Sequence, residues 1–394
     1  ITKLKLNGYS FGFYEGNCPP VYGPARNCFY VPHHFYGVLP ENGVVQKVIP
    51  ETRSQVSIQL GHREAFLSEI VEIGKSYEKG LTVCLQIVYY YSQWQNVILY
   101  IEAWRAQGAT RFIVYFHSAT QDTKKVLDYY EKLGLIELRP WPNVGALSSY
   151  IAPYHPKIDD SVFIIASHIA LQVCSLEIRT ELGIVADFDE VMVPGDGSVL
   201  EYAELVMAGK NIGALLFENT HVGLEPNIYT NDFSGMKTLT FINIFAPPKN
   251  CRICRNQCFC CVLSERQGEK SFITIGYIFN TSLIDICETH SPGKFLHNST
   301  TTLFSNGTVL HFRFNIKEIK ANVVEKPYRF FPNSTEGHIW NMHDTMHKIF
   351  GATPPIFSYT PILTMNLCIA KATPNVCHST GNLCKAEMDN VTSW

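Results

Sequence analysis

The chain has few charged residues, and it has neither a long hydrophobic run nor a basic stripe. Charged residues make up 17% of its 394 residues, a share more typical of secreted or luminal proteins than of cytosolic enzymes. The most apolar stretch, 161–176, is broken by Ser167, His168 and Gln172 and does not reach the roughly 18 to 20 residues of a membrane span. The net charge of −3, with basic residues scattered along the chain, argues against a nucleic-acid partner. We therefore expect a globular chain outside the membrane, attached to one only through an anchor that precedes Ile1.

Cysteine, by contrast, is abundant. Thirteen cysteines are many for a reducing compartment and favour an oxidising one. Five glycosylation sequons, which point the same way, begin at Asn280, Asn298, Asn306, Asn333 and Asn390. The odd number of cysteines leaves at least one thiol unpaired, and Cys84 and Cys174, each inside an apolar segment, are predicted to be buried free thiols.

Two patterns resemble zinc sites, and both are better explained in other ways. The segment 251–261 has a Cys-x-x-Cys pair and further thiols but not a second pair at zinc-finger spacing, so the compartment favours disulfides there. His343-Asp-Thr-Met-His347 is similar to the zinc-protease motif His-Glu-x-x-His, with Asp in place of Glu. Because Asp reaches less far and no third ligand follows at a recognisable spacing, chance similarity is favoured.

The apolar runs predict a small accessory module followed by an α/β domain. Residues 1–79 are rich in glycine, proline and aromatics and contain short alternating pieces at 45–49 and 55–60, which favours a β-rich module. Strands and helices then alternate in the order βαβαβ, over 81–88, 93–108, 111–116, 122–133 and 135–139. Such units form a parallel sheet, and ligands bind beyond the carboxyl ends of its strands.

The pattern continues with a helix over 167–182, a strand that leads into acidic residues, a helix over 199–208 and a strand over 212–217 that ends at Glu218. Strand-like pieces follow at 272–279 and 308–314. The predicted domains are the module at 1–79, a catalytic domain at 80–330 with a cysteine-rich insertion at 246–268, and a cysteine-containing extension at 331–394.

Three acidic positions, Asp187, Asp189 and Glu190, follow the apolar strand that contains Ile184 and Val185. Alternation along a strand would send Asp187 and Asp189 to the same side, where two carboxylates repel unless a divalent cation lies between them. Such a cation usually carries phosphate. The sequence therefore predicts a metal and phosphate site here, with Glu190 as a supporting residue.

Alternatives to a metal site remain open at this point. The acids could cap the next helix or face solvent, since Asp-x-Asp is short and common. In a nucleotide-sugar transferase, Asp-x-Asp holds manganese against the donor diphosphate. In a phosphatase of the haloacid-dehalogenase type, Asp187 would be the nucleophile and Asp189 the acid and base, but that motif normally follows the first strand of the core. A non-catalytic secreted carbohydrate-binding protein is the rival from another class.

The segments 81–91, 92–115 and above all 185–194 resemble glycosyltransferase family 92, whose members have a GT-A fold, and 309–314 is similar to that family's Leu-His segment. The resemblance covers about 80–316. It implies an α/β GT-A nucleotide-diphospho-sugar transferase with a Rossmann-like mixed sheet, a UDP-galactose donor, manganese and inversion at the anomeric carbon. The family's invertebrate members that add β1,4-galactose to the core fucose of N-glycans are the most similar, which implies a fucosylated N-glycan acceptor and a type II membrane protein of the Golgi lumen.

The resemblance also implies roles for single residues. Inversion needs a base that takes the proton of the acceptor hydroxyl, and Glu218 is the first candidate, with Glu225 and Asp232 as alternatives; each could instead bind acceptor hydroxyls or cap a turn. A late histidine often supplies a third metal ligand in GT-A domains, beside Asp187 and Asp189, and His290 and His311 have suitable positions.

The donor nucleotide should lie at the ends of the first two strands of the α/β domain. By position, the residues expected to contact it are Gln86, Ile87, Val88, Tyr115 and His117. Asp187 would also face the diphosphate of the donor, through the metal.

Overall fold

The structure is a computed structural model. It describes residues 6–10, 33–37, 56–60, 63–67, 77–141, 167–207, 210, 212–223, 231–234, 238–243, 262–266, 269–273, 275–282, 284–288, 291–295, 300–302, 306–313, 322–327, 335–371, 384–391 and 394.

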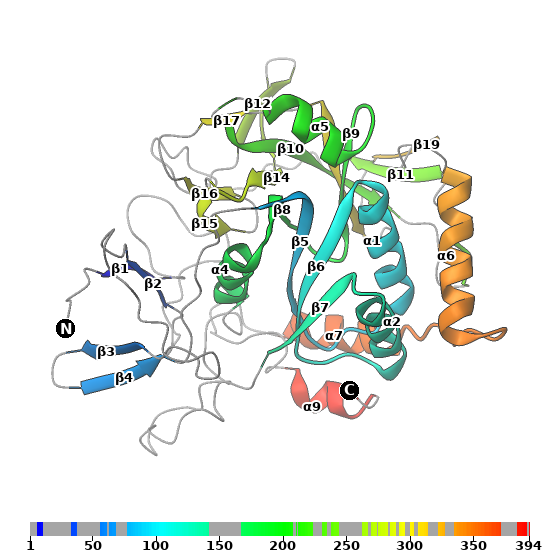
Figure 1. Cartoon of the computed structure of the whole chain (residues 1–394). Helices are drawn as coiled ribbons and strands as arrows, with labels where there is room; N and C mark the ends of the chain where they lie inside the picture. The colour runs from blue at the N-terminus through cyan, green and yellow to red at the C-terminus, as the bar shows by residue number, and fades with distance from the viewer. Residues whose placement is uncertain are drawn as a thin grey trace.

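One mixed β-sheet forms the centre of the molecule, and its main path runs in the order β19-β11-β10-β14-β8-β5-β6-β7 (Figure 1). The strands of this path are β5 (Glu78–Val88), β6 (Ala109–Phe116), β7 (Ile136–Pro140), β8 (Thr180–Val185), β10 (Ile212–Gly223), β11 (Thr238–Asn243), β14 (Ile275–Asn280) and β19 (Asn322–Pro327). The four strands β7, β6, β5 and β8 are parallel. β14 is antiparallel to both of its neighbours, β8 and β10, so the sheet is mixed.

Three further strands complete the sheet next to β10. β17 (Thr300–Thr302) and β18 (Gly307–Arg313) pair with β10 in parallel, and β9 (Glu190–Pro194) pairs antiparallel with β18. β9 begins at Glu190, the last residue of the predicted acidic cluster. The sheet therefore brings the acidic segment beside strands that come about 120 residues later in the chain.

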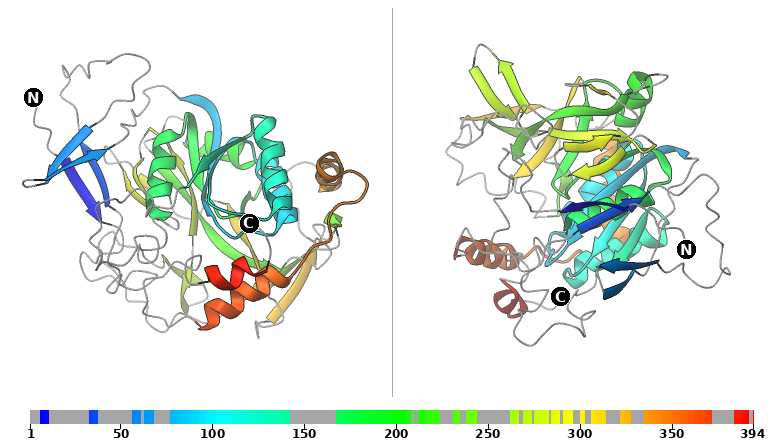
Figure 2. Two further views of the ribbon diagram at one scale, coloured as in Figure 1. Left: turned by 90° about the horizontal axis from the view of Figure 1, so that it is seen from below. Right: turned by 90° about the vertical axis from the view of Figure 1, so that its left-hand side faces the viewer.

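Helices cover both faces of the sheet. α1 (Trp94–Ala106), α2 (Gln121–Lys132) and α6 (Thr335–Phe350) lie on one face, and α4 (Ser167–Glu177) lies on the other (Figures 1 and 2). The side chains of β6 divide accordingly. Phe112 and Val114 belong to the core cluster beneath α1 and α2, whereas Ile113 and Tyr115 belong to the cluster beneath α4. This alternation is the period expected of a strand buried on both sides.

The predicted α/β class and the order of its first elements are confirmed, but two boundaries are wrong and one strand was missed. The helix predicted over 167–182 ends at Glu177, because Thr180–Val185 pairs with β5 and β14 as β8. The strand predicted over 212–217 continues to Gly223, because β18 pairs with β10 from Glu218 onward. β9 was not predicted, since its five residues begin at Glu190, inside the acidic cluster itself.

The prediction of free thiols at Cys84 and Cys174 is also wrong. The two cysteines form a disulfide with their Cα atoms 6.0 Å apart. The physical reason is the sheet alternation, because Cys84 points from β5 toward the face that α4 covers, where Cys174 is fully buried. A second disulfide, Cys368–Cys384, joins α7 (Thr360–Lys371) to the start of α9 (Lys385–Asp389). Both agree with the predicted oxidising compartment.

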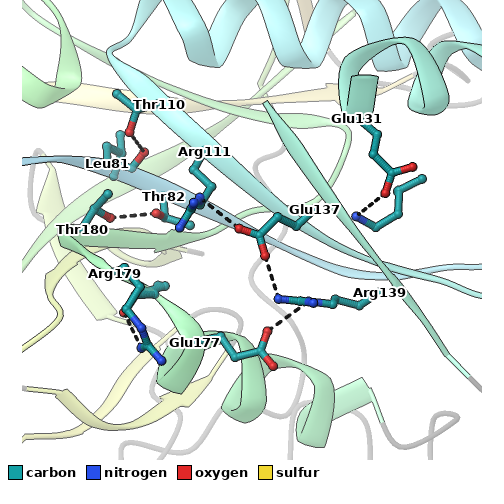
Figure 3. Close-up of polar contacts among 12 residues, drawn as sticks. Leu81, Thr82, Thr110, Arg111, Glu131, Glu137, Arg139, Glu177, Arg179 and Thr180 are labelled. Carbon is teal, nitrogen blue, oxygen red and sulfur yellow. Dashed lines mark hydrogen bonds and ion pairs between the residues drawn. The ribbon is translucent and has the colours of Figure 1, made fainter. Parts of the chain in front are cut away.

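A chain of charged side chains runs across the sheet toward α4 (Figure 3). Arg111 on β6 and Arg139 on β7 both contact Glu137, at 3.0 and 2.7 Å, and Arg139 also contacts Glu177 on α4 at 3.3 Å. All of these side chains are partly exposed, so each pair contributes little to stability, on the order of 0–1 kcal/mol. Their role is to tie the edge strand β7 to the neighbouring strand and helix.

Short pairs of antiparallel strands lie outside the central sheet. They are β1 (Leu6–Ser10) with β2 (His33–Gly37), β3 (Val56–Leu60) with β4 (Arg63–Leu67), β12 (Val262–Arg266) with β13 (Glu269–Ile273), and β15 (Ile284–Glu288) with β16 (Ser291–Phe295). The strand predicted over 55–60 is confirmed as β3. The strand predicted over 45–49 and the cysteines of 251–261 lie outside the described residues. Among the helices that the structure describes, none is long and apolar enough to cross a membrane.

Removing the buried disulfide, by Cys84→Ala with Cys174→Ala, should lower the free energy of unfolding by roughly 2–4 kcal/mol, because the bond restricts the unfolded chain. Urea denaturation followed by circular dichroism measures the loss. The matched control is Cys368→Ala with Cys384→Ala, which opens a loop of 16 rather than 90 residues and should cost less. Alkylation of Cys84 in the native protein without a reductant would contradict the pairing.

Candidate active site

The two predicted metal ligands lie in a tight turn between β8 and β9, which we call the acidic loop, residues 186–190. The amide of Glu190 donates to the carbonyl of Asp187 at 2.9 Å and closes the turn. Phe188 is buried at its tip, 4.9 Å from the ring of Tyr91, whereas Asp187 and Asp189 on either side are partly exposed. A turn anchored by an aromatic side chain, rather than the end of a strand, therefore presents the two carboxylates.

Helix α1 holds the backbone of this loop through three side chains spaced four residues apart. Asn96 Nδ2 donates to the carbonyl of Phe188 at 3.0 Å. Tyr100 Oη donates to the carbonyl of Ala186 at 3.1 Å, and Trp104 Nε1 donates to the carbonyl of Glu190, also at 3.1 Å. Residues at this spacing share one face of a helix, so three successive turns of α1 fix three carbonyls of the loop.

The sheet fixes the loop from its other side. The amide of Ala186 donates to the carbonyl of Cys84 on β5 at 3.1 Å, and the amide of Phe312 on β18 donates to the carbonyl of Asp189 at 2.7 Å. The loop backbone is therefore hydrogen-bonded to α1, β5 and β18. Such a preorganised backbone fixes where its side chains can point.

The buried tyrosine of α1 keeps its proton. Burial raises the pKa of the Tyr100 hydroxyl well above its ordinary value, and the nearby negative charges of Asp187, Glu190 and Asp189 act in the same direction. Burial likewise raises the pKa of Tyr91, with a smaller contribution in that direction from Asp189 and Asp187. Both hydroxyls therefore stay neutral at physiological pH, and that of Tyr100 remains a hydrogen-bond donor to the loop.

His311 lies between two of the acids. Its Nε2 is 3.1 Å from Asp189 Oδ2, and its Nδ1 is 3.3 Å from Glu190 Oε1. The antiparallel register of β9 and β18 places His311 directly opposite Glu190. The structure thus brings the predicted histidine to the acidic loop across 122 residues of sequence.

Two residues that the sequence did not single out complete this group. Asn219 Nδ2 donates to Glu190 Oε1 at 3.2 Å and lies 3.3 Å from His311 Nδ1. The ring of His221 stacks on that of His311 with centroids 4.9 Å apart. Alternation along β10 puts both on the face that carries His311, and only knowledge that the strand continues past Glu218 could have indicated them.

The donors at this position fit a divalent cation. Asp189 Oδ2 and His311 Nε2 are 3.1 Å apart, and two neighbouring ligands of an octahedral ion with bonds of about 2.1 Å are about 3 Å apart. A carboxylate oxygen and an imidazole nitrogen are both common ligands of such ions. Within the described part of the chain, no three His, Cys, Asp or Glu side chains converge as a complete metal-binding group. As ligands of a divalent ion, Asp189 and His311, which are hydrogen-bonded to each other in this structure, would need further ligands from a bound substrate and water.

The candidate bases have different surroundings. Glu218 lies inside β10 rather than at its end, and alternation directs it to the face opposite Asn219 and His221. Asp232 is part of a turn in which Ser234 Oγ donates to Asp232 Oδ2 at 2.6 Å, and this bond holds the pKa of Asp232 below its ordinary value. A lowered pKa makes a carboxylate a weaker base. Glu225 and the second histidine candidate, His290, lie outside the described residues.

The positions predicted for the nucleotide do not share one surface. The ends of β5 and β6 are joined where the amide of His117 donates to the carbonyl of Val88 at 2.9 Å. Ile87 and Tyr115 are buried in the cluster beneath α4, whereas Val88 is buried in the cluster beneath α1. The pairing register shifts in this part of β5, around Gln86. A nucleotide role for these residues stays a prediction, and His117, partly exposed beyond β6, is the best placed of them.

The two histidines of the zinc-protease-like pattern have other partners. His343 on α6 accepts from the amide of Phe233 at 3.4 Å and lies 3.5 Å from Asp232. His347 Nδ1 lies 3.0 Å from the carbonyl of Gly351, past the end of the helix. These contacts explain both histidines as parts of the α6 framework.

Comparison with known protein families assigns a family to the domain that carries the acidic loop. The family model described as "Glycosyltransferase family 92" matches residues 79–350, from β5 through α6. The chain belongs to glycosyltransferase family 92. The matched residues are more than half of the chain and include Asp187, Asp189, Glu190 and His311.

Solved structures give much weaker similarities, and no curated protein matches the chain. TarS from S. aureus (residues 1–349) aligns with 11% identity and a TM-score of 0.30, over 79% of this chain and 83% of that one. A second TarS structure aligns with 10% identity and a TM-score of 0.25, and the match spans 36% of this chain and only 22% of that TarS chain. Glucosyl-3-phosphoglycerate synthase from Mycobacterium tuberculosis, in complex with Mn²⁺, uridine diphosphate and glucosyl-3-phosphoglycerate, aligns with 12% identity and a TM-score of 0.23, over 52% and 58%. TM-scores this low carry no functional conclusion.

Family membership makes the chain a glycosyltransferase with the GT-A-type mixed sheet that the resemblance implied. The phosphatase alternative loses its support, because the acidic motif follows the fourth strand of the sheet along the chain, β8, rather than the first.

Tyr100→Phe should lower the free energy of unfolding by about 1–2 kcal/mol, because the buried carbonyl of Ala186 loses its donor while the ring packing stays. Urea denaturation measures the change. Tyr129→Phe, a partly buried tyrosine of α2 on the same side of the sheet, is the control and should change stability by less than about 0.5 kcal/mol. Equal losses in the two variants would show that the Tyr100 bond does not matter to the loop.

Proposed function

We propose that this glycosyltransferase moves galactose from UDP-galactose to a glycan hydroxyl with inversion, and that it depends on Mn²⁺. The observation that carries the proposal is the pairing of Asp189 with His311, an acid of the Asp-x-Asp motif and a late histidine, 3.1 Å apart. Family membership supports sugar transfer, and the resemblance of the chain to invertebrate members supports the core fucose of N-glycans as the β1,4 acceptor.

Asp189 and His311 would hold the metal, with Asp187, at the other end of the turn, as a further ligand. When bound, the cation would neutralise the charge that develops on the departing diphosphate. The chain itself supplies the rigid placement of these ligands, because α1 and β18 fix the loop backbone before any substrate arrives. Preorganised ligands need no reorganisation as the glycosidic bond breaks.

On the acceptor side, a carboxylate would take the proton of the attacking hydroxyl. The candidates are still Glu218, Glu225 and Asp232. Asp232 is the least suited of the described pair, since Ser234 and His343 already engage it and its pKa is lowered. Glu218 keeps its place as first candidate because it is partly exposed on the strand next to β18, although alternation along β10 directs its side chain to the face opposite that of His311.

The rival proposal, a non-catalytic carbohydrate-binding protein, leaves the Asp189 and His311 pair without a purpose. The two disulfides are typical of the luminal compartment in which such transferases work, which supports a Golgi location.

The test is a donor panel. The protein is incubated with Mn²⁺ and each of several UDP-sugars, with and without fucosylated N-glycans, and products are identified by mass spectrometry. We expect transfer from UDP-galactose only, only to fucosylated acceptors, and lost on chelation of the metal. Product from a different UDP-sugar alone would overturn the choice of galactose.

The same assay tests the metal ligands. Asp189→Ala should abolish transfer while the circular dichroism spectrum stays unchanged, since the loop is held by its backbone. Asp196→Ala is the matched control, because this exposed acid follows β9 and bonds only locally to the amide of Gly197 at 2.9 Å, and it should retain full activity. Unchanged transfer by Asp189→Ala would refute the metal role.

Identification of the base needs three variants, Glu218→Gln, Glu225→Gln and Asp232→Asn. The variant of the true base should lose roughly 10²–10⁴-fold in kcat while UDP binding, measured by calorimetry, is kept. We expect this of Glu218→Gln, and a decrease in stability rather than in kcat for Asp232→Asn. A full kcat in all three variants would exclude a carboxylate base from this set.

A further inference from the structure

We propose that Glu190, supported by Asn219, is a positioning residue that orients the imidazole of His311 so that Nε2 faces the metal position beside Asp189. This inference rests on the proposed metal-dependent function and extends it to residues that do not themselves bind the ion. It is carried by contacts among three neighbouring strands, β9, β18 and β10.

Glu190 is the buried member of the acidic motif. Its side chain is 4% exposed, whereas that of Asp189 is 27% exposed. A carboxylate that has been removed from water is strongly destabilising unless hydrogen-bond donors surround it. Asn219 Nδ2 donates to Glu190 Oε1 at 3.2 Å, and His311 Nδ1 lies 3.3 Å from the same oxygen. Glu190 is therefore held in the interior, and Asp189 is the more exposed acid that can reach a ligand.

Each ring nitrogen of His311 faces a carboxylate. Nε2 is hydrogen-bonded to Asp189 Oδ2 at 3.1 Å, and Nδ1 lies 3.3 Å from Glu190 Oε1. An ionised carboxylate only accepts hydrogen bonds, and a neutral imidazole carries a single hydrogen. With a cation at the metal position, Nε2 would give its lone pair to the ion, and the hydrogen would lie on Nδ1 and be donated to Glu190.

Asn219 and His221 restrict the group further. The amide of Asn219 holds Glu190 Oε1 from β10, so the carboxylate cannot turn away from His311. The stacked ring of His221, inclined by 28° to that of His311, limits rotation of the imidazole. A metal-bound histidine whose second nitrogen donates to a carboxylate is a general device for fixing ring orientation.

The experiment measures Mn²⁺ affinity by isothermal titration calorimetry on the full chain, in the absence of substrate. The variants are Glu190→Ala, Glu190→Gln, Asn219→Ala, His311→Ala and the double variant Glu190→Ala with His311→Ala. We expect Glu190→Ala to weaken binding about 10–100-fold. In the His311→Ala background, the same change should have no further effect, because Glu190 acts through the histidine.

The matched control is Thr220→Val. Thr220 lies between Asn219 and His221 on β10 but faces the other side, where its hydroxyl contacts that of Thr308 at 2.7 Å. It should bind Mn²⁺ within about twofold of the wild type, so a loss confined to the Glu190 and Asn219 variants is not a general effect of disturbing these strands.

Wild-type affinity in Glu190→Ala, or a second full loss when Glu190→Ala is added to His311→Ala, would overturn this inference and leave the proposed function standing. Failure of the wild type itself to bind Mn²⁺ would overturn both. If Glu190→Ala does not fold, as judged by circular dichroism, Glu190→Gln and Asn219→Ala decide the question, with the same expected direction and a smaller loss.

Discussion

The candidate site depends on the row of hydrogen bonds from α1 to the acidic loop. Asn96, Tyr100 and Trp104 each reach a different carbonyl of a five-residue turn, and each is buried. Because the three carbonyls are buried, moving the loop away from α1 would leave them without hydrogen-bond donors, which costs free energy. The position of Asp187 and Asp189 is thereby linked to the packing of the helix against the sheet. The candidate site and the core therefore form one connected unit.

Much of the fold could be predicted from the sequence because its first elements are long and strongly patterned. The continuous apolar run of β5 and the helical spacing of Val97, Tyr100 and Trp104 specify their elements locally. The end of β10 and the whole of β9 could not be predicted, since both pair with β18, more than 80 residues later in the chain. The disulfide between Cys84 and Cys174 escaped prediction for the same reason, because an apolar setting does not show which cysteine lies opposite.

The part of the candidate site that lies in one short motif could be predicted from the sequence. Asp187 and Asp189 stand out because two acids follow an apolar strand, and His311 stands out with the help of the family resemblance. Asn219 and His221 gave no local signal. They are ordinary polar residues whose significance comes from strand register, which places them beside His311 on one face of the sheet. Register is a long-range property that a single sequence does not display.

The buried disulfide and the acidic loop meet at one residue. Cys84 is bonded to α4 through its sulfur, while its carbonyl accepts the amide of Ala186 at the start of the loop. The disulfide therefore restrains the same stretch of β5 to which the start of the loop is hydrogen-bonded. The covalent link to α4 and the hydrogen bond to the acidic loop thus act on one and the same residue of β5.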